Sequence, residues 1–168
     1  MGKNILAVTI TEITNDNRVI NYTNALANHG YQVNLICPVS KRKSSTKYQF
    51  NPVYVPLSTT KFPSFLAFGL LKTFEFICRS VFKAKEVKCE IIHANDLKGL
   101  VIASLIKHFV HRSVTIVYDA HEYETELNGL KGFQKKVYKF LERKLIKDVS
   151  RLITVSDSIA QEYVRLYG

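Results

Sequence analysis

The sequence predicts a three-layer α/β fold in which helices cover both faces of a parallel sheet. Short apolar segments rich in β-branched residues alternate with longer segments of helical periodicity. The apolar segments are almost wholly hydrophobic, which is typical of strands buried on both faces. With 168 residues, of which 46% are hydrophobic, the chain is large enough to bury one core. We therefore expect one doubly wound domain over residues 1–168.

The first half of the chain is expected to contain three strands and one clear helix. The strands are predicted over residues 4–10, 31–37 and 53–56. The helix is predicted over residues 18–28, with Val19 and Tyr22 on its apolar face. Gly30 supplies the C-terminal stop of this helix, and Pro38 ends the second strand.

The second half repeats the strand–helix alternation. Strands are predicted over residues 91–94, 114–118 and 152–155, and helices over residues 97–109, 133–147 and 158–166. Ser156 stands before the last helix and is expected to cap it. The whole pattern indicates a parallel sheet with helical crossovers.

Residues 62–82 are unusually rich in phenylalanine and leucine. Lys72, Glu75 and Arg79 recur at helical spacing and form a polar stripe that would place charge in the middle of a bilayer, which argues against a membrane span. Two interpretations remain open. The helix packs in the core, or it lies at a membrane surface with basic residues beside its apolar face.

The composition limits the classes of partner and the compartment. Lys plus Arg number 24 against 14 for Asp plus Glu, so the net charge of +10 indicates a polyanionic partner: nucleic acid, anionic lipid or a phosphorylated ligand. Three cysteines without a Cys-x-x-Cys pair argue against a disulfide framework or zinc site and favour a reducing compartment. The N-terminus lacks the pattern of an export signal, so we expect a cytoplasmic protein.

Three ionisable residues follow the predicted strand 114–118 directly. They are Asp119, His121 and Glu122, and they form the first candidate for a catalytic site. In an open parallel sheet, ligands bind outside the carboxyl ends of the strands, which is where these side chains are expected. The alternative is that His121 is an ordinary loop residue with no role in a site.

Two other strand ends carry candidate binding residues. After the first strand come Asp16, Asn17 and Arg18, where a helix N-terminus and a cation can bind phosphate or carboxylate; alternatively, Asp16 or Asn17 only caps the helix. No Gly-x-Gly-x-x-Gly motif occurs there, which argues against a dehydrogenase. His93 and Asp96 lie at the end of the fourth strand, and for Asp96 a role as N-cap is favoured.

The predicted helix 133–147 carries a basic ridge. Its members recur every four residues and are Lys131, Lys135, Lys139, Arg143 and Lys147. Steps of four drift by only about 40° around a helix, so these charges share one winding face. The face is either simply solvated or binds anionic lipid head groups or phosphates. Aromatic residues that could stack on bases are missing from the ridge, so no nucleic-acid partner is expected.

Four segments together resemble the N-terminal half of the two-domain GT-B glycosyltransferases, particularly the large family-four group. They are Leu-Ala-Asn-His-Gly-Tyr-Gln-Val at 26–33, Ile-His-Ala-Asn-Asp at 92–96, Val-Tyr-Asp-Ala-His-Glu at 117–122 and Leu-Ile-Thr-Val-Ser-Asp-Ser-Ile-Ala at 152–160. The last is the most specific, because in such enzymes a Val-Ser-x-x-Ile stretch precedes the crossing into the second domain. The resemblance implies a Rossmann-like sheet.

The resemblance also implies an activity. Family members transfer a sugar, typically a hexose, from a nucleotide-sugar donor to an acceptor hydroxyl in polysaccharide, lipopolysaccharide or glycolipid synthesis, generally without a bound metal or other cofactor. The N-terminal domain shapes the acceptor side, and a C-terminal domain, which we expect to be absent from this chain, holds most of the donor. His121 falls where the family places a histidine near the reacting sugar and the donor phosphate. The loop 11–18 lacks the family's glycine-rich turn, so Arg18 or the helix N-terminus is expected to replace that phosphate contact.

Further expectations follow for the isolated chain. Half of a cleft cannot hold donor and acceptor in reactive geometry, so this domain alone should be inactive. We expect the whole enzyme to act on a glycan or lipid-linked acceptor, peripherally on the inner face of the membrane. Two alternatives stay open: a non-enzymatic module that docks on an anionic partner through its basic ridge, and a nucleotide-sugar epimerase of the same fold.

Overall fold

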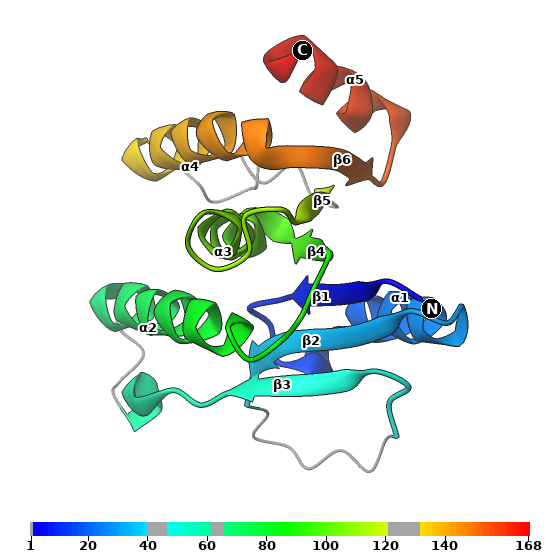
Figure 1. Ribbon diagram of the computed structural model, residues 1–168. Helices are drawn as coiled ribbons and strands as arrows, with labels where there is room; N and C mark the ends of the chain where they lie inside the picture. The colour runs from blue at the N-terminus through cyan, green and yellow to red at the C-terminus, as the bar shows by residue number, and fades with distance from the viewer. Residues whose placement is uncertain (1, 40–46, 62–65, 121–131) are drawn as a thin grey trace.

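Six strands form one fully parallel sheet in a computed structural model that describes residues 2–39, 47–61, 66–120 and 132–168. The strands are β1 (Asn4–Val8), β2 (Gln32–Pro38), β3 (Asn51–Val55), β4 (Ile91–Asn95), β5 (Thr115–Ala120) and β6 (Val149–Thr154). Their order across the sheet is β3-β2-β1-β4-β5-β6 (Figure 1). The prediction of a Rossmann-like doubly wound α/β domain is confirmed.

Five α-helices connect or follow the strands. They are α1 (Asn17–Asn28), α2 (Leu66–Ala84), α3 (Asp96–Phe109), α4 (Phe133–Leu145) and α5 (Asp157–Tyr167). The described residues also form three short 3₁₀ turns, η1 (Ile13–Asn15), η2 (Ser58–Lys61) and η4 (Ile146–Asp148). Gly30, with a φ of 86°, follows α1, and the Ser156 hydroxyl accepts a hydrogen bond from the Ile159 amide at the start of α5. Both predicted helix boundaries are therefore confirmed.

The core consists of two layers of side chains, one on each face of the sheet. Helices α2, α3 and α4 are stacked along one face, and α1 covers the other face at β1 and β2 (Figure 1). Successive residues of β1 point to opposite faces, so Leu6 belongs to the first layer while Ile5 and Ala7 belong to the second. Because both layers are apolar, the strands read as uninterrupted hydrophobic runs.

The chain adds β2 and β3 on one side of β1 and then β4, β5 and β6 on the other side. The place beside β1 where this order reverses is the topological switch point of the sheet, and three strand ends lie at or near it. β2 and β4 both pair with β1, from opposite sides, and β5 pairs with β4. The carboxyl ends of β1, β4 and β5 therefore lie next to one another, and in this register Asn95 is opposite Asp119. Such a crevice is the usual ligand-binding place of an open α/β sheet.

The sixth strand begins three residues earlier than its apolar pattern predicts. β6 starts at Val149 rather than Leu152 because a bulge lets β5 continue the ladder, pairing Ile116 with Val149 and Val117 with Arg151. The first residues of β6 are thus fixed by backbone pairing at the sheet edge and not by burial.

The phenylalanine-rich segment forms α2, and only part of its apolar surface is covered. Phe76 is buried, whereas Leu70, Phe74 and Phe82 are exposed. Core packing therefore accounts for one face of α2 but not for the other, which remains exposed. Within the described parts of the chain, every helix is too short or too polar to cross a bilayer.

A buried carboxylate joins α4 and α5 to the sheet. Glu142 of α4 is fully buried and accepts hydrogen bonds from the hydroxyls of Tyr118 at 3.1 Å, Tyr167 at 2.8 Å and Tyr163. Burial raises the pKa values of Tyr118 and Tyr163, so both remain neutral donors. Three donors to one carboxylate satisfy a group that would otherwise strongly destabilise the fold.

Candidate functional site

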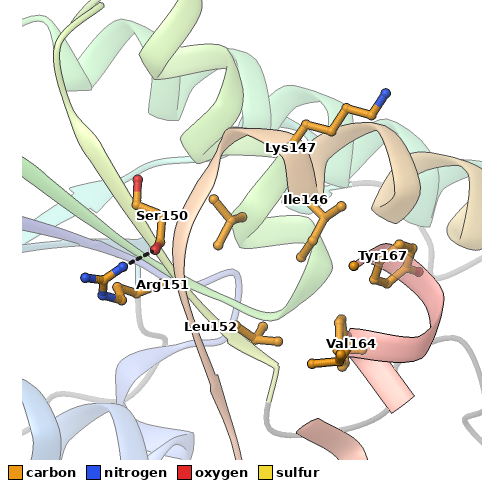
Figure 2. Close-up of a pocket in the computed structure, with 10 residues that line it drawn as sticks. Ile146, Lys147, Ser150, Arg151, Leu152, Val164 and Tyr167 are labelled. Carbon is orange, nitrogen blue, oxygen red and sulfur yellow. Dashed lines mark hydrogen bonds between the residues drawn. The ribbon is translucent and has the colours of Figure 1, made fainter. Parts of the chain in front are cut away.

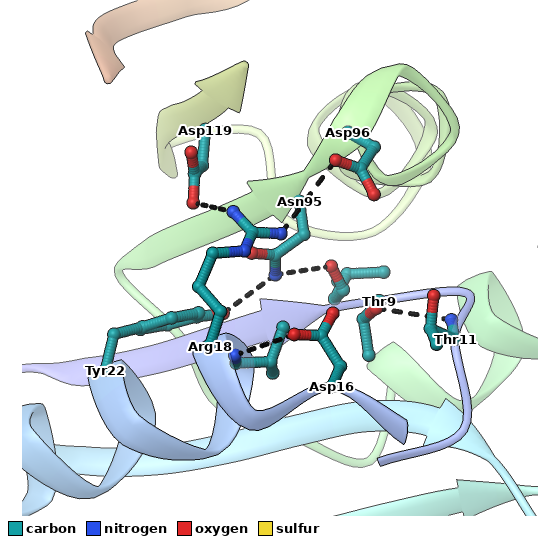
Figure 3. Close-up of polar contacts among 10 residues, drawn as sticks. Thr9, Thr11, Asp16, Arg18, Tyr22, Asn95, Asp96 and Asp119 are labelled. Carbon is teal, nitrogen blue, oxygen red and sulfur yellow. Dashed lines mark hydrogen bonds and ion pairs between the residues drawn. The ribbon is translucent and has the colours of Figure 1, made fainter. Parts of the chain in front are cut away.

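An arginine clamp lies at the switch point of the sheet. Arg18, in the first turn of α1, places Nη1 2.6 Å from Oδ2 of Asp119 at the end of β5 (Figure 3). Its Nη2 lies 4.0 Å from Oδ1 of Asp96 at the start of α3. Three residues predicted from separate strand ends are therefore brought together. We name Arg18, Asp96 and Asp119 the edge cluster.

The turn that leads into α1 is closed by hydroxyl and carboxylate groups in place of glycine. The Thr11 amide donates to the buried Thr9 hydroxyl at 3.2 Å, and Asp16 Oδ1 accepts from the Val19 amide at 3.1 Å. Asp16 thus caps α1, as one of the two open interpretations held. Asn17 begins the helix and is exposed.

A residue that sequence reasoning did not single out fixes the floor of the site. Asn95 is buried, and its Nδ2 donates to the Val8 carbonyl at 2.9 Å and to the Tyr22 hydroxyl at 2.7 Å (Figure 3). It therefore ties the end of β4 to β1 and to α1. The only sign of Asn95 in the sequence is that an amide side chain occupies the last position of a strand that is otherwise mostly apolar. Burial raises the pKa of Tyr22, which stays protonated.

Asp96 has an unusual backbone conformation. Its φ is 62°, and no other described non-glycine residue has a positive φ. The N-cap of α3 is Asn95 and not Asp96, so the favoured prediction for Asp96 was wrong. A left-handed conformation costs an L-residue roughly 1–2 kcal/mol, and such strain concentrates at functional sites. Here it directs the carboxylate toward Arg18.

His93 lies beneath the edge cluster and is neutral at physiological pH. Its ring centroid is 4.4 Å from that of Tyr22, with 31° between the ring planes, and only 8% of the residue is exposed. Burial, followed by the charge of Arg18, lowers the pKa of His93 to about 4. A role in ligand binding stays a prediction for this residue.

Carboxylates outnumber guanidinium groups within the edge cluster itself. The carboxylates of Asp96 and Asp119 both lie beside the guanidinium of Arg18. Carboxylate oxygens accept hydrogen bonds from hydroxyl groups, whereas they repel phosphate. This edge is therefore better suited to a hydroxyl-bearing ligand than to a pyrophosphate.

The remaining predicted site residues are placed only in part. His121, Glu122 and Lys131 lie outside the described residues. Lys135, Lys139 and Arg143 lie on α4 and Lys147 on η4; the last three are exposed, as a ridge requires, and Lys135 is half-buried. In the parts of the chain that the structure describes, no group of three His, Cys, Asp or Glu side chains is arranged to hold a metal, and all three cysteines are free.

A pocket of about 450 Å³ lies away from the edge cluster. It is formed by β6, η4 and α5, with Leu152 and Ile146 facing Val164 and Tyr167 (Figure 2). Lys147 is the one predicted site residue among those that line it. The hollow therefore provides no support for the catalytic assignment.

Comparison with known proteins gives both a family and a fold. Residues 16–168 match the family model Glycosyltransferase Family 4. Sucrose-phosphate synthase from Thermosynechococcus elongatus has a similar structure, with a TM-score of 0.69 at 13% identity over 97% of this chain and 44% of that one. The apo form of the lipopolysaccharide outer core galactosyltransferase WaaB gives 0.63 at 10% identity over 98% and 42%.

A third similar structure is UGT2 from Phytolacca americana, complexed with UDP-2-fluoro-glucose and pterostilbene, with a TM-score of 0.54 at 10% identity over 89% of this chain and 35% of that one. The chain spans less than half the length of each of these three proteins. No curated protein sequence matches it. The resemblance inferred from the four motifs is confirmed at the level of family and fold.

Proposed function

Because this chain belongs to glycosyltransferase family 4, we propose that it forms the acceptor-side wall of an enzyme that transfers a sugar from a nucleotide-sugar donor to an acceptor hydroxyl. The observation that supports this role is the edge cluster, in which Arg18 bonds to Asp119 at 2.6 Å and lies 4.0 Å from Asp96. It stands at the switch point of the sheet, where α/β folds bind their ligands.

The cluster is proposed to orient the acceptor. Asp119 and Asp96 accept hydrogen bonds from acceptor hydroxyls, and Arg18 holds the two carboxylates in place. Fixing a hydroxyl near the anomeric carbon contributes to the rate by removing translational and rotational freedom. His121, two residues after Asp119 in the sequence, is the residue we propose to contact the reacting sugar and the donor phosphate, and we propose that Glu122 beside it takes part in catalysis.

The donor is proposed to bind mainly to a second domain. Asp16 already occupies the Val19 amide at the N-terminus of α1, and the two carboxylates of the edge cluster disfavour a pyrophosphate beside them. We propose a hexosyl donor, no metal or other cofactor, and an acceptor in polysaccharide, lipopolysaccharide or glycolipid synthesis on the cytoplasmic face of the membrane. On this proposal the 168-residue chain alone binds nucleotide sugars weakly and does not turn them over.

Steady-state kinetics of the protein that carries both domains tests the acceptor-side role. Asp119→Asn should raise the KM for the acceptor at least tenfold and leave the KM for the donor within twofold. Arg165→Gln, which breaks an exposed pair with Glu162 on α5, serves as the matched control and should change neither. An Asp119→Asn variant that shifts only the donor KM would refute the assignment.

The role of His121 is tested separately in the same protein. His121→Ala should reduce kcat by orders of magnitude, and near wild-type turnover in this variant would exclude His121 from catalysis.

A non-enzymatic docking role is the second candidate, and the exposed ridge on α4 and η4 favours it. Lys139, Arg143 and Lys147 would bind an anionic partner independently of the edge cluster. Binding that is lost in Lys139→Gln/Arg143→Gln but retained in Asp119→Asn, without any sugar transfer by the two-domain protein, would support this role. A nucleotide-sugar epimerase would instead change the donor sugar without an acceptor, which product analysis distinguishes.

A further inference from the structure

The outward face of α2 is apolar along most of its length. Leu70 and Phe82 are 67% and 68% exposed, Phe74 is 64% exposed, and Leu71 and Cys78 are exposed beside them. At 100° per residue these five side chains fall within an arc of about 120°. We name these five residues the α2 stripe. Contiguous apolar surface of this kind on a soluble domain marks an interaction site.

The fold holds the α2 stripe outward. Phe76, Ser80 and Ala84 recur every four residues and are buried, so they define the face that packs on the domain. On a third face, Glu75 accepts hydrogen bonds from the Ser58 amide at 2.9 Å, the Thr59 amide at 3.0 Å and the Thr59 hydroxyl at 2.6 Å.

Arg79 completes this attachment of α2 to η2. Its Nε lies 2.8 Å from Glu75, and its Nη2 donates to the Ser58 hydroxyl at 2.9 Å. These bonds lower the pKa of Glu75 to about 2, so the carboxylate stays charged at physiological pH. Rotating α2 to bury Phe74 or Phe82 would break all of them, and the stripe therefore stays exposed.

Basic side chains border the stripe. Residues 61–88 contain six basic and two acidic side chains, a net charge of +4. Lys85 Nζ lies 4.8 Å from the centre of the Phe82 ring, so a cation and an exposed aromatic group occupy the same end of the helix. Lys88 follows on the same segment, whereas Lys83 lies on another side of α2, 2.9 Å from Glu86. Apolar groups with a basic margin complement a surface that is apolar inside and anionic outside.

A second helix adds to this end of the surface. His111 Nε2 lies 3.0 Å from the carbonyl oxygens of both Ala84 and Val87, which holds the C-terminal ends of α3 and α2 together. Phe109, two residues before His111, is 74% exposed. Exposed aromatic residues thus occur near the C-terminal ends of two neighbouring helices.

We propose that the α2 stripe with its lysine margin is an interfacial membrane-docking surface for anionic lipid. The helix would lie in the plane of the interface, with Phe74 and Phe82 inserted below the phosphates and Lys85 and Lys88 among them. The stripe lines neither the pocket formed by β6, η4 and α5 nor a second hollow formed by β1, β2, β3 and residues 86–88. A flat, deformable surface therefore suits it better than an inserted peptide. This surface lies on a different helix from the basic ridge of α4.

Vesicle co-sedimentation of the 168-residue chain tests the proposal. Binding to vesicles of three parts phosphatidylcholine to one part phosphatidylglycerol should be at least tenfold tighter than to phosphatidylcholine alone and should weaken with salt. Phe74→Ser/Phe82→Ser should reduce the partition constant by roughly tenfold or more, because each buried aromatic side chain contributes strongly. Phe140→Ser, at a 60% exposed phenylalanine on α4, is the matched control and should leave the constant within twofold.

A fluorescent probe gives a readout that does not depend on mutating the stripe's aromatic residues. Cys78 is exposed within the stripe, whereas Cys37 is buried, so an environment-sensitive thiol dye on Cys78 in a Cys89→Ser background reports directly. Its emission should shift to the blue when anionic vesicles are added. The same dye on Val164→Cys, in α5 of a chain that also carries Cys78→Ser and Cys89→Ser, should not shift.

Several outcomes would overturn the proposal. These are an absence of vesicle binding by the parent chain, equal binding by Phe74→Ser/Phe82→Ser, or loss of binding only with Phe140→Ser. Sedimentation equilibrium tests whether a second copy of the chain covers the stripe instead of lipid. A dimer that Phe74→Ser/Phe82→Ser abolishes would assign the stripe to that second copy. Sugar transfer is not measured in any arm, so failure here leaves the proposed activity untouched.

Discussion

The buried histidine His93 makes the stability of the domain depend on pH between about 4 and 6.5. Its pKa is lowered from 6.5 to about 4, chiefly by burial. The folded state therefore favours the neutral ring, so this contribution to stability is fully present above pH 6.5. It is lost as the pH falls from 6.5 through 4.

The size of the effect follows from the shift. A difference of about 2.5 pKa units at 1.36 kcal/mol per unit gives at most about 3 kcal/mol, and about 2–3 kcal/mol of this should be lost by pH 4.5. Against a typical unfolding free energy of about 5–15 kcal/mol, that loss is large enough to measure by urea denaturation.

Urea denaturation at pH 7.5 and pH 4.5, followed by far-ultraviolet circular dichroism, measures this loss, since the chain contains no tryptophan. His93→Phe keeps a ring beside Tyr22 but cannot be protonated, so its unfolding free energy should change far less between the two pH values. His29→Gln, at an exposed histidine, is the control and should retain the wild-type dependence. An unaltered pH dependence in His93→Phe would show that protonation of His93 is not responsible.

Three more predictions concern single side chains. Glu142→Leu leaves the hydroxyls of three tyrosines without their acceptor and should lower the free energy of unfolding by about 3 kcal/mol or more in urea titrations, while Glu142→Gln should lower it less. Asp96→Gly relieves the positive φ and should raise the melting temperature while, on the proposed function, reducing sugar transfer; a lowered melting temperature would contradict the strain argument. Glu75 has a depressed pKa, so it contributes stability above pH 4.5 that is lost as the pH falls toward 2; Glu75→Gln should reduce the melting temperature at pH 7 but not at pH 2, as differential scanning calorimetry would reveal.

The order of strands and helices could be predicted because each element depends on its own residues. Uninterrupted apolar runs identified the buried strands, and Gly30 and Ser156 marked helix ends through local backbone chemistry. The start of β6 at Val149 was missed because its first residues are held by a bulged ladder with β5 and not by burial. A single strand's sequence carries no record of which partner it pairs with.

The candidate site was predictable in its location but not in its internal bonds. The rule that strand ends collect ligands identified Arg18, Asp96 and Asp119 as neighbours of one edge. That Arg18 bonds to Asp119, about a hundred residues later, depends on the three-dimensional arrangement of α1 and β5. Asn95 was missed because its importance comes from contacts with the Val8 carbonyl and Tyr22, which the sequence does not place nearby.

The two hydrogen bonds that α5 donates to Glu142 make this helix sensitive to the register of its own sequence. Tyr163 and Tyr167 are four residues apart and so share one face of the helix. Hydrogen bonds are directional, unlike the apolar contacts that hold most helices, and adding or deleting one residue earlier in α5 would turn both hydroxyls by about 100°. Substitutions along the exposed side of this helix should be tolerated, whereas a single insertion before Tyr163 should detach it. The helix is thus fixed in rotation about its axis as well as in position.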